Sequence, residues 1–361
     1  MSLRVEGVSK RFGKKEVLKN VNVDVESGSI FCILGPPGAG KTTLFYVIAG
    51  LIEPDKGKIY LDGCDITEVP PERRKISMVF QNYALYPTKT VYENIANPLR
   101  IRKMRKDEID KRVKEVADLL WIGELLDRKP RELSGGEAQR VAIARALAPE
   151  DNKVVLLDEP FINLDYKIRE ELRVRFKEIL KKLNRTFIFA SPDPFDALAM
   201  ADYVAVMYNG VVCAQGKVSE IYSRPPDPFA SLYFGRPLRN SIEASLVEKE
   251  GKTFLDAGIF VVDVSPLRAK FAGAGKEFIL YVKPEDLRLN EKVEKGAVMF
   301  EAKILACEPS SETLLALEVD NVVLYALLPG FQQFVEGTKV KVSFDIKKVN
   351  IYSKQLGKMI T

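Results

Sequence analysis

The chain has 361 residues, 46% of them hydrophobic, and its 55 basic and 50 acidic side chains give a net charge of +5. This length suggests two or three domains with substantial cores, and no run approaches the ~18 consecutive apolar residues that a membrane-spanning helix needs. The charges are interspersed and form no basic stripe with aromatic residues, so we expect no nucleic-acid partner.

Up to about residue 235, apolar strand-like runs alternate with helical patterns. Strands are expected at 21–25, 30–34, 154–157 and 187–190, hairpins at 58–66 and 204–215, and helices at 42–49, 106–121, 140–147 and about 166–183. Asp62-Gly63 and Asn209-Gly210 suit the tight turns of the two hairpins. The alternation predicts an α/β core around a parallel sheet that is covered on both faces.

The pattern changes near Pro225-Pro226-Asp227-Pro228, and beyond residue 236 short β-type runs replace the helical periods. These runs are 278–282, 302–307, 314–319, 322–328 and 340–344. They predict a smaller all-β barrel or sandwich. We therefore divide the chain into domains 1–235 and 236–361, with the boundary near Gly235-Arg236-Pro237.

Residues 35–42 match the phosphate-loop pattern G-x-x-x-x-G-K-[ST]. They read Gly35-Pro36-Pro37-Gly38-Ala39-Gly40-Lys41-Thr42, with Thr43 next. Glycines let backbone N–H groups turn inward around a phosphate, and the N-terminus of the following helix adds positive charge. Lys41 should reach the β- and γ-phosphates and Thr42 should bind Mg²⁺, which predicts Mg-ATP as the ligand. The alternative is a plain glycine turn before a helix.

Two carboxylates follow the apolar strand at 154–157. At the carboxyl end of a parallel strand beside a phosphate loop, Asp158 can hold Mg²⁺ and Glu159 can polarise the attacking water as a general base. Between these two motifs lies Leu133-Ser134-Gly135-Gly136-Glu137, whose hydroxyl and backbone donors could serve a γ-phosphate. A capped helix N-terminus is the alternative for this segment.

In this order, the three segments resemble the ATP-binding cassette (ABC) family, and Gln139-Arg140-Val141 and Ala144-Arg145-Ala146 continue its pattern. The resemblance implies that Ser134, Gly135 and Gly136 act across a dimer on nucleotide held by the other subunit. It also implies that Gln81 contacts Mg²⁺ and the water, and that Phe12 stacks on adenine, although core packing is a rival for Phe12. Lys41, Gln81 and Glu159 are thus the expected catalytic residues.

The family's glutamine loop also forms the groove for a permease's coupling helix. The apolar surface expected there is Tyr83, Leu85, Tyr86, Val91, Tyr92 and Ile95, within the segment from Gln81 to Ile95. Each of these residues could equally belong to the core.

Residues 1–235 most resemble the ATPase subunits of carbohydrate importers, in the motif Pro71-Glu72-Arg73-Arg74 and in the segments 78–87 and 91–95. Lys283-Pro284-Glu285-Asp286 resembles an element of their C-terminal regulatory domain. The resemblance implies a phosphate-loop ATPase with a helical signature subdomain and a C-terminal oligosaccharide-binding-type barrel. It further implies a homodimer or a paired cassette that serves transmembrane permease subunits and, indirectly, a solute-binding protein. We expect the chain to lie peripherally on the cytoplasmic face of the membrane.

The chain departs from the family at three places. Ile162 replaces a serine before Asn163-Leu164-Asp165, and Thr88-Lys89 stands where His-Met is usual. Most important, the family's switch-loop histidine is replaced by Pro192, in a chain that has no histidine. Proline offers neither a side-chain donor nor a backbone N–H.

The four cysteines are Cys32, Cys64, Cys213 and Cys307. They lack metal-site spacing, so we expect reduced thiols and no zinc site. The start of the chain has no signal-peptide pattern, which favours the cytoplasm.

Three functions are compatible with the sequence. The first is a sugar-importer ATPase, or the same subunit for a polyamine, iron, sulfate or molybdate. The second is a slow-turnover ATP-dependent switch. The third is an ABC ATPase of DNA repair or translation, which the β-rich tail and the single cassette argue against.

Overall fold

The computed structural model describes residues 2–161, 173, 177–183, 185–235, 239–290 and 297–360. By contacts the chain divides into two compact units, Met1–Val218 and Ser219–Thr361. The boundary that we predicted after Gly235 falls inside the second unit. The reason is that the short helices before it belong to that unit: the Tyr222 hydroxyl donates to Glu285 Oε1 at 2.5 Å.

The first unit is built around the expected, mostly parallel sheet, with strand order β10-β9-β3-β8-β7-β6. Its strands are β3 (Ile30–Leu34), β6 (Ile76–Val79), β7 (Val154–Asp158), β8 (Thr186–Ser191), β9 (Tyr203–Tyr208) and β10 (Val211–Lys217). The antiparallel pair β9–β10 is the predicted hairpin, and Asn209 and Gly210 have φ of 47° and 83°. All side chains of β3, β7 and β8 are buried, as expected for strands covered on both faces.

A second, antiparallel sheet has the order β2-β1-β4-β5. Its strands are β1 (Leu3–Phe12), β2 (Lys15–Val25), β4 (Lys56–Leu61) and β5 (Cys64–Asp65). The hairpin with its turn at Asp62-Gly63 is therefore confirmed, whereas the analysis of the sequence did not predict β1. Leu44, Phe45, Val47 and Ile48 of helix α1 (Lys41–Ala49) belong to the same buried cluster as residues of both sheets.

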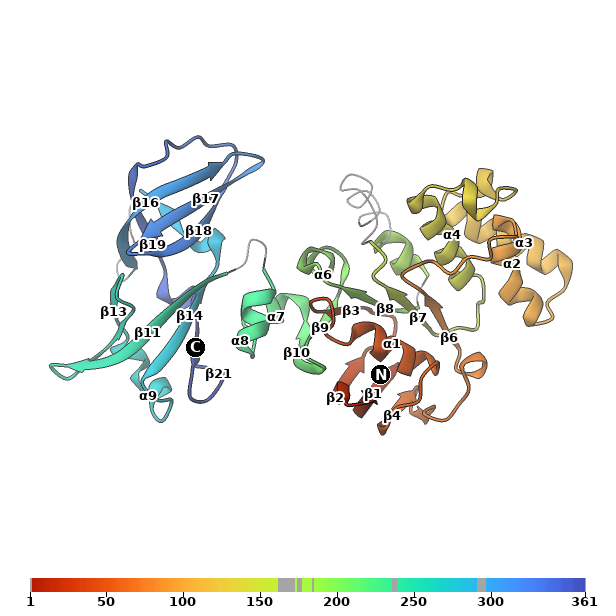
Figure 1. The fold of residues 1–361 in the computed structure, drawn as a ribbon, viewed down its shortest axis with the longest axis horizontal. Coiled ribbons are helices and arrows are strands. Elements are labelled where there is room, and N and C mark those ends of the chain that lie inside the picture. The colour runs from red at the N-terminus through yellow and green to blue at the C-terminus, as the bar shows by residue number, and fades with distance from the viewer. Residues whose placement is uncertain are drawn as a thin grey trace. The chain divides into compact units, whose positions relative to one another are not determined.

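Helices α2 (Val91–Ile101), α3 (Lys106–Leu119) and α4 (Gly135–Leu147) pack together beyond β6, as Figure 1 shows. They form the predicted helical subdomain. We expected α4 to begin at Arg140 after a glycine turn, but Gly135 and Gly136 are already helical. Helix α2 was not predicted, although Thr90 and Glu93 form a capping box at its start. Helix α6 (Pro194–Met200) was not predicted either.

The second unit begins with the short helices α7 (Val218–Ser223) and α8 (Pro228–Tyr233), and α9 (Arg268–Phe271) lies further along its chain. One antiparallel sheet has the order β13-β12-β11-β14-β20-β21 and the other the order β15-β19-β16-β17-β18. The first comprises β11 (Asn240–Lys249), β12 (Lys252–Asp256), β13 (Val261–Asp263), β14 (Glu277–Val282), β20 (Asn350–Ser353) and β21 (Lys358–Met359). The second comprises β15 (Arg288–Leu289), β16 (Val298–Glu308), β17 (Glu312–Val319), β18 (Val322–Pro329) and β19 (Lys339–Phe344).

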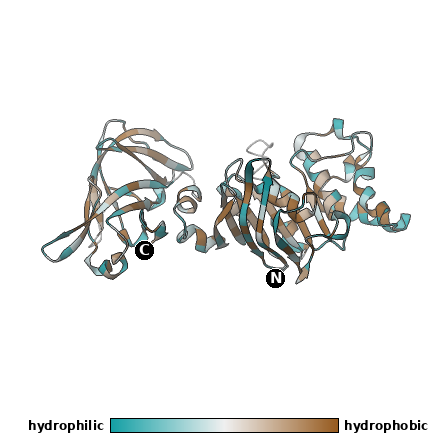
Figure 2. Ribbon diagram, turned by 60° about the horizontal axis from the view of Figure 1, so that its bottom comes forward, coloured by the Kyte–Doolittle hydropathy of each residue, from teal (hydrophilic) through white to brown (hydrophobic). Residues whose placement is uncertain are grey.

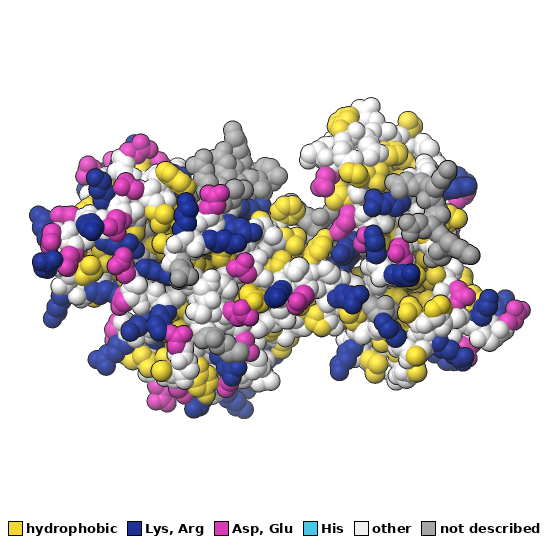
Figure 3. Space-filling model, turned by 180° about the vertical axis from the view of Figure 1, so that it is seen from behind, with side chains coloured by type: hydrophobic (Ala, Val, Ile, Leu, Met, Phe, Trp, Pro, Cys, Tyr) yellow, Lys and Arg dark blue, Asp and Glu magenta, His cyan; other side chains and the backbone are white. Residues whose placement is uncertain are grey.

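Side chains from both of these sheets share one buried hydrophobic cluster, so the predicted β-rich domain is confirmed. Figure 2 shows hydrophobic and hydrophilic stretches along the strands, which fits strands with one buried and one exposed face. On the face drawn in Figure 3, basic and acidic side chains are interspersed.

Some predicted features lie outside the described residues, namely Ile162 to Asp165, Arg236-Pro237 and most of the helix expected at about 166–183. Of that helix, the structure describes Arg173 and residues 177–183. Within the described part of the chain, no helix is both long and apolar enough to cross a membrane.

Candidate nucleotide-binding site

The phosphate loop connects β3 to α1 in a conformation that depends on its glycines. Gly38 and Gly40 have φ of 80° and 106°, which side-chain-bearing residues rarely adopt. A Cβ on Gly35 would lie 2.2 Å from the carbonyl oxygen of Met207. Gly40 is the N-cap of α1, so the unpaired N–H groups of this helix face the loop. The segment therefore has the backbone geometry of an anion cradle, and it is more than a plain turn.

Lys41 is the buried cation of this loop. It is 3% exposed, and its Nζ donates to the carbonyl oxygens of Gly35 at 2.8 Å and Pro36 at 3.2 Å. The same ammonium pairs with Glu159 Oε1 at 3.1 Å. These contacts compensate the desolvation of a buried charge and hold the ammonium inside the loop.

Asp158, at the end of β7, lies against the first turn of α1. The Thr42 hydroxyl donates to its Oδ1 at 3.1 Å. Burial raises the pKa of Asp158 to about 6, because the side chain is 2% exposed and the nearby Glu159 adds negative charge. Thr42 and Asp158 thus present hydroxyl and carboxylate oxygens together, and oxygen donors are what Mg²⁺ prefers. Because burial destabilises the negative charge of Asp158, a cation bound beside this carboxylate would stabilise it.

Gln81 and Glu159 meet on the same side of the site. Gln81 Nε2 donates to Glu159 Oε2 at 3.4 Å. Glu159 itself has a left-handed backbone, with φ of 48°, which is uncommon for this residue type and often marks a functional position. A pocket of about 480 Å³ opens here, and it is lined by Tyr46, Phe80, Gln81, Asn82, Ala84 and Asp158. The structure therefore joins the predicted residues Lys41, Thr42, Gln81, Asp158 and Glu159 in one connected set.

Arg145, which has no role predicted from the sequence, holds the loop after Gln81. Its guanidinium, on α4, donates to the carbonyl oxygens of Tyr83 at 2.8 Å and Ala84 at 2.7 Å. Both of these loop residues have positive φ, 63° and 46°. A conformation of this kind persists only when its surroundings hold it, so Arg145 fixes the loop.

Ser134 is the N-cap of α4, as the alternative interpretation expected. Its hydroxyl accepts from the N–H of Glu137 at 3.3 Å, and Glu137 Oε2 accepts from the N–H of Ser134 at 2.7 Å. Glu137, where the family has glutamine, therefore completes a capping box. Ser134 and Gly135 are nevertheless exposed, so capping does not bury the segment.

The loop after β8 contains Pro192 and lies beside the phosphate loop, because the N–H of Gly35 donates to the carbonyl oxygen of Ser191 at 3.1 Å. The next residue, Asp193, has both carboxylate oxygens engaged. Oδ1 accepts from the N–H of Phe195 at 3.0 Å, and Oδ2 pairs with Arg173 at 3.2 Å.

Arg173, which the sequence did not single out, is the buried centre of this loop. It is 3% exposed, and its Nε donates to Asp196 Oδ1 at 2.7 Å. The Ser191 hydroxyl also donates to the Asp196 carboxylate. A buried charge network of Arg173, Asp193 and Asp196 therefore holds the loop.

The exposure of the side chains tests the core alternative for Phe12 and for the expected permease surface. Phe12 is 48% exposed, which excludes core packing as its role. In the Gln81–Ile95 segment, Val91 and Ile95 are fully buried core residues, whereas Tyr86 is 42% exposed. Among the six apolar residues that we listed for this surface, the core reading is therefore correct for Val91 and Ile95.

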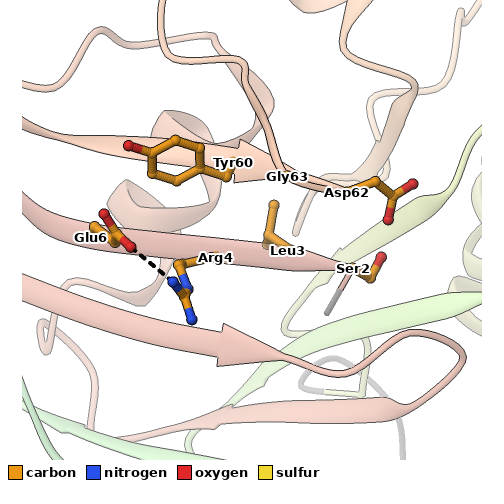
Figure 4. Close-up of a pocket in the computed structure, with 7 residues that line it drawn as sticks. All are labelled: Ser2, Leu3, Arg4, Glu6, Tyr60, Asp62 and Gly63. Atoms are coloured by element: carbon orange, nitrogen blue, oxygen red, sulfur yellow. Dashed lines mark hydrogen bonds and ion pairs between the residues drawn. The ribbon is translucent and has the colours of Figure 1, made fainter.

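A separate pocket of about 330 Å³ lies on the antiparallel sheet of the first unit (Figure 4). It is lined by Ser2, Leu3, Arg4, Glu6, Tyr60, Asp62 and Gly63. Arg4 pairs with Glu6 at 3.2 Å, and its Nε donates to Asp24 at 2.8 Å. The pocket shares no lining residue with the predicted ATP site.

Together, the strand–loop–helix cradle, the two carboxylates after β7 and the helical subdomain define a phosphate-loop ATPase cassette. The model of the ABC transporter family matches residues 18–162. The chain is 39% identical over 372 residues to the trehalose/maltose import ATP-binding protein MalK of Thermococcus litoralis, with 99% of each chain covered. The chain belongs to the ABC transporter family and is an ATP-binding ATPase, as the sequence motifs predicted.

Other relatives carry different names. The spermidine/putrescine import ATP-binding protein PotA of Vibrio parahaemolyticus is 39% identical, with 89% of this chain and 83% of PotA covered. The alpha-glucoside transport ATP-binding protein AglK of Rhizobium meliloti is 36% identical, with 97% of each covered.

A solved structure of the cassette MJ0796, a dimer bound to ADP and Pi, matches with a TM-score of 0.55 and 30% identity. It covers 60% of this chain and 98% of the cassette.

Proposed function

We propose that this chain hydrolyses ATP to drive an importer, and that its solute is a sugar. The observation that carries the proposal is the connected set Lys41, Thr42, Gln81, Asp158 and Glu159 in a chain that matches the trehalose/maltose import protein MalK over 99% of its length. The alpha-glucoside relative AglK supports the same solute class.

The binding roles follow from the geometry of the phosphate loop. The backbone N–H groups of residues 38–42 cradle the phosphates, with Lys41 as the cation and Phe12 as the exposed ring available to adenine. Thr42, Asp158 and Gln81 would hold Mg²⁺ through oxygen atoms. When bound, Mg²⁺ supplies positive charge against the β- and γ-phosphates.

Glu159 is the proposed general base, and its contacts link the binding of ATP to the hydrolysis step. Its two carboxylate oxygens contact Lys41 at 3.1 Å and Gln81 at 3.4 Å. To reach the phosphates of ATP, Lys41 must turn its ammonium away from Glu159. ATP binding therefore breaks the Lys41–Glu159 contact, and the carboxylate is left to accept a proton from the attacking water. The glutamine is then in place to orient the same water.

A second subunit supplies the remaining donors in this proposal. Ser134 and Gly135 are exposed at the start of α4, where the helix N-terminus favours negative charge. The dimeric cassette MJ0796 is a solved example of paired subunits. We therefore infer a head-to-tail dimer in which Ser134 and Gly136 of one subunit complete the phosphate site of the other.

The permease would dock beside the Gln81 loop, with the chain peripheral on the cytoplasmic face of the membrane. A groove of about 610 Å³ between α2 and α3 is lined by Tyr92, Arg100, Met104, Lys106, Ile109 and Asp110, of which Tyr92 belongs to the Gln81–Ile95 segment. With Tyr86 exposed nearby in sequence, the groove offers both apolar and charged contacts to a helix.

A polyamine importer is the second candidate, because relatives named for spermidine and putrescine import match most of the chain. The two candidates share all of the ATP chemistry. They differ in the solute alone, which meets the permease and the solute-binding protein.

The test has one biochemical and one cellular arm. Purified chain should release phosphate from Mg-ATP, and Glu159→Gln should abolish release while ATP binding persists. In cells that depend on this chain, Lys41→Ala should stop the uptake of labelled trehalose or maltose and leave spermidine uptake unchanged. Loss of spermidine uptake alone would replace the sugar assignment with the polyamine one. An unchanged phosphate release in Lys41→Ala would remove the ATPase assignment itself.

A further inference from the structure

The second unit contains a pocket that the ATP site does not explain. Its volume is about 440 Å³, which is in the range of small-molecule sites. Its lining comes from the end of α7, from α9, from the segments after β14 and β19, and from the end of the chain. The lining residues are Ser223, Arg224, Lys270, Lys283, Asp286, Lys347, Lys348, Val349, Asn350, Met359 and Ile360.

The charge of this lining is one-sided. Five of its side chains are basic and one, Asp286, is acidic. The Asp286 carboxylate lies 3.6 Å from Lys348 Nζ, a distance at which it compensates one lysine in part. Burial, and after it the charge of Arg239, lowers the pKa of Lys283, while Asp286 and Glu285 offset part of that shift. Like charges gathered around a concavity are stabilised by an anion.

The base of the pocket is polar and organised. Asn350 is 4% exposed and Arg239, behind it, is 3% exposed. In the amide orientation that satisfies both of its polar atoms, Asn350 accepts from Arg239 at 2.5 Å and donates to the Ser223 carbonyl oxygen at 3.3 Å. Arg239 also donates to Ser231 Oγ at 3.2 Å, and its Nε has no partner within the described residues. A buried guanidinium therefore adds fixed positive charge below the pocket.

The remaining lining residues indicate that a ligand would have a carbon skeleton and hydroxyl groups. Val349, Met359 and Ile360 provide apolar surface for a carbon skeleton. The Asp286 carboxylate offers oxygen atoms to hydroxyl groups. Lys283 is held over the Tyr222 ring at 4.5 Å, so its position is defined by packing. We propose that this pocket is an effector site for a small phosphorylated polyol such as a sugar monophosphate.

A phosphate monoester matches the pocket because it carries close to two negative charges and three acceptor oxygens at neutral pH. Flexible lysines and Arg224 can surround such a group without needing a fixed bidentate geometry. The site does not depend on the identity of the transported solute, and it shares no residue with the phosphate loop.

The test is isothermal titration calorimetry of the full chain with glucose 6-phosphate, in saturating Mg-ADP so that the ATP site is filled. We expect one site per chain, an affinity that falls as salt is raised, and no binding of glucose. Inorganic phosphate should bind more weakly, because it lacks the hydroxyl and apolar contacts. Equal affinity for phosphate and glucose 6-phosphate would overturn the polyol part of the proposal.

The variant Lys270→Gln/Lys347→Gln removes two exposed lysines of the pocket and should weaken binding about tenfold or more. The matched control is Lys339→Gln/Lys341→Gln, which removes the same charge from exposed positions on β19. No binding by the wild-type chain, or equal weakening in the control, would contradict the pocket. Sedimentation with phosphatidate vesicles, without any glucose 6-phosphate binding, would assign the basic residues to a lipid headgroup and overturn the proposal as well.

Discussion

Asp193 stands one residue after the proline that replaces the switch-loop histidine, and its carboxylate is committed elsewhere. One oxygen caps α6, and the other pairs with the buried Arg173. Asp193 therefore does not act as a free anion facing the phosphate. The carbonyl of Ser191 keeps the loop at the phosphate loop, so a donor at position 192 would lie close to the reacting phosphate.

At this residue scale, Pro192→His should raise the rate of ATP hydrolysis. One preorganised donor to the developing charge is worth on the order of a hundred- to a thousand-fold in rate. The measurement is phosphate release at saturating Mg-ATP, with Pro192→Ala as the control that removes the ring and restores the backbone N–H without adding a side-chain donor. An equal rise in both variants would show that the proline acts through its backbone, by its fixed φ or its missing N–H, and no rise in either would show that another group already serves the phosphate.

Asp158 makes a second prediction at the same scale. Its folded-state pKa of about 6 lies above the ordinary value of 3.8, so the folded chain favours the protonated acid. The stabilising effect of protonation is complete below about pH 4 and is lost as pH rises through about 6. Asp158→Asn should therefore increase the free energy of unfolding at pH 7 by about 2–3 kcal/mol while abolishing hydrolysis.

Urea unfolding of both proteins, without added nucleotide or Mg²⁺, checks the Asp158 prediction. Their difference in stability should shrink as the pH falls from 7 to 5. A difference that is independent of pH would contradict the account of Asp158.

At the scale of elements, α4 connects two parts of the site. Its N-terminus carries the exposed Ser134, and near its C-terminus Arg145 holds the loop after Gln81. A shift of this helix relative to the loop would therefore change both the signature segment and the glutamine that lies beside Glu159.

Replacing Arg145 with methionine should misplace Gln81 and lower kcat by about tenfold or more, with little change in ATP affinity. Arg112→Met is a matched control, since Arg112 also donates to backbone carbonyls, at Leu147 and Ala148, but away from the Gln81 loop. Steady-state kinetics of the two variants should differ in kcat. If both lose activity equally, general destabilisation of the helical subdomain explains the effect.

The sequence predicted the elements whose pattern is local. β3, β7 and β8 are continuous apolar runs, and both predicted turns of the first unit have the expected residues. It does not predict α2, although Thr90 and Glu93 form a capping box at its start, and it misplaces the start of α4, because Gly135 and Gly136 favour a turn but are helical. Arg145 and Arg173 could not be found from sequence, because their partners lie about 60 and 20 residues away and meet only in the fold.

At the scale of the whole molecule, the proposal requires two chains for each active site. Within one chain, Lys41 contacts Glu159 and Thr42 contacts Asp158, while Ser134 is exposed at the start of a helix in another subdomain. A Glu159→Gln chain should therefore form a stable dimer in Mg-ATP and dissociate in Mg-ADP, because binding persists while hydrolysis is blocked. Light scattering measures this, and the same mass in both nucleotides would count against ATP-driven closure.

The most direct test of an ATPase built from two subunits is complementation between two inactive variants. Lys41→Ala lacks the cation of the phosphate loop. Ser134→Asp keeps a good helix N-cap but sets a carboxylate against the γ-phosphate, and Ser134→Asn is its uncharged control. Each inactive variant alone should release little phosphate from Mg-ATP.

When the two inactive proteins are mixed, a mixed dimer regains one intact site, formed by the phosphate loop of the Ser134→Asp chain and the Ser134 of the Lys41→Ala chain. We predict that phosphate release recovers on mixing. A mixture that stays as inactive as its components, although size-exclusion chromatography shows mixed dimers, would contradict the composite site.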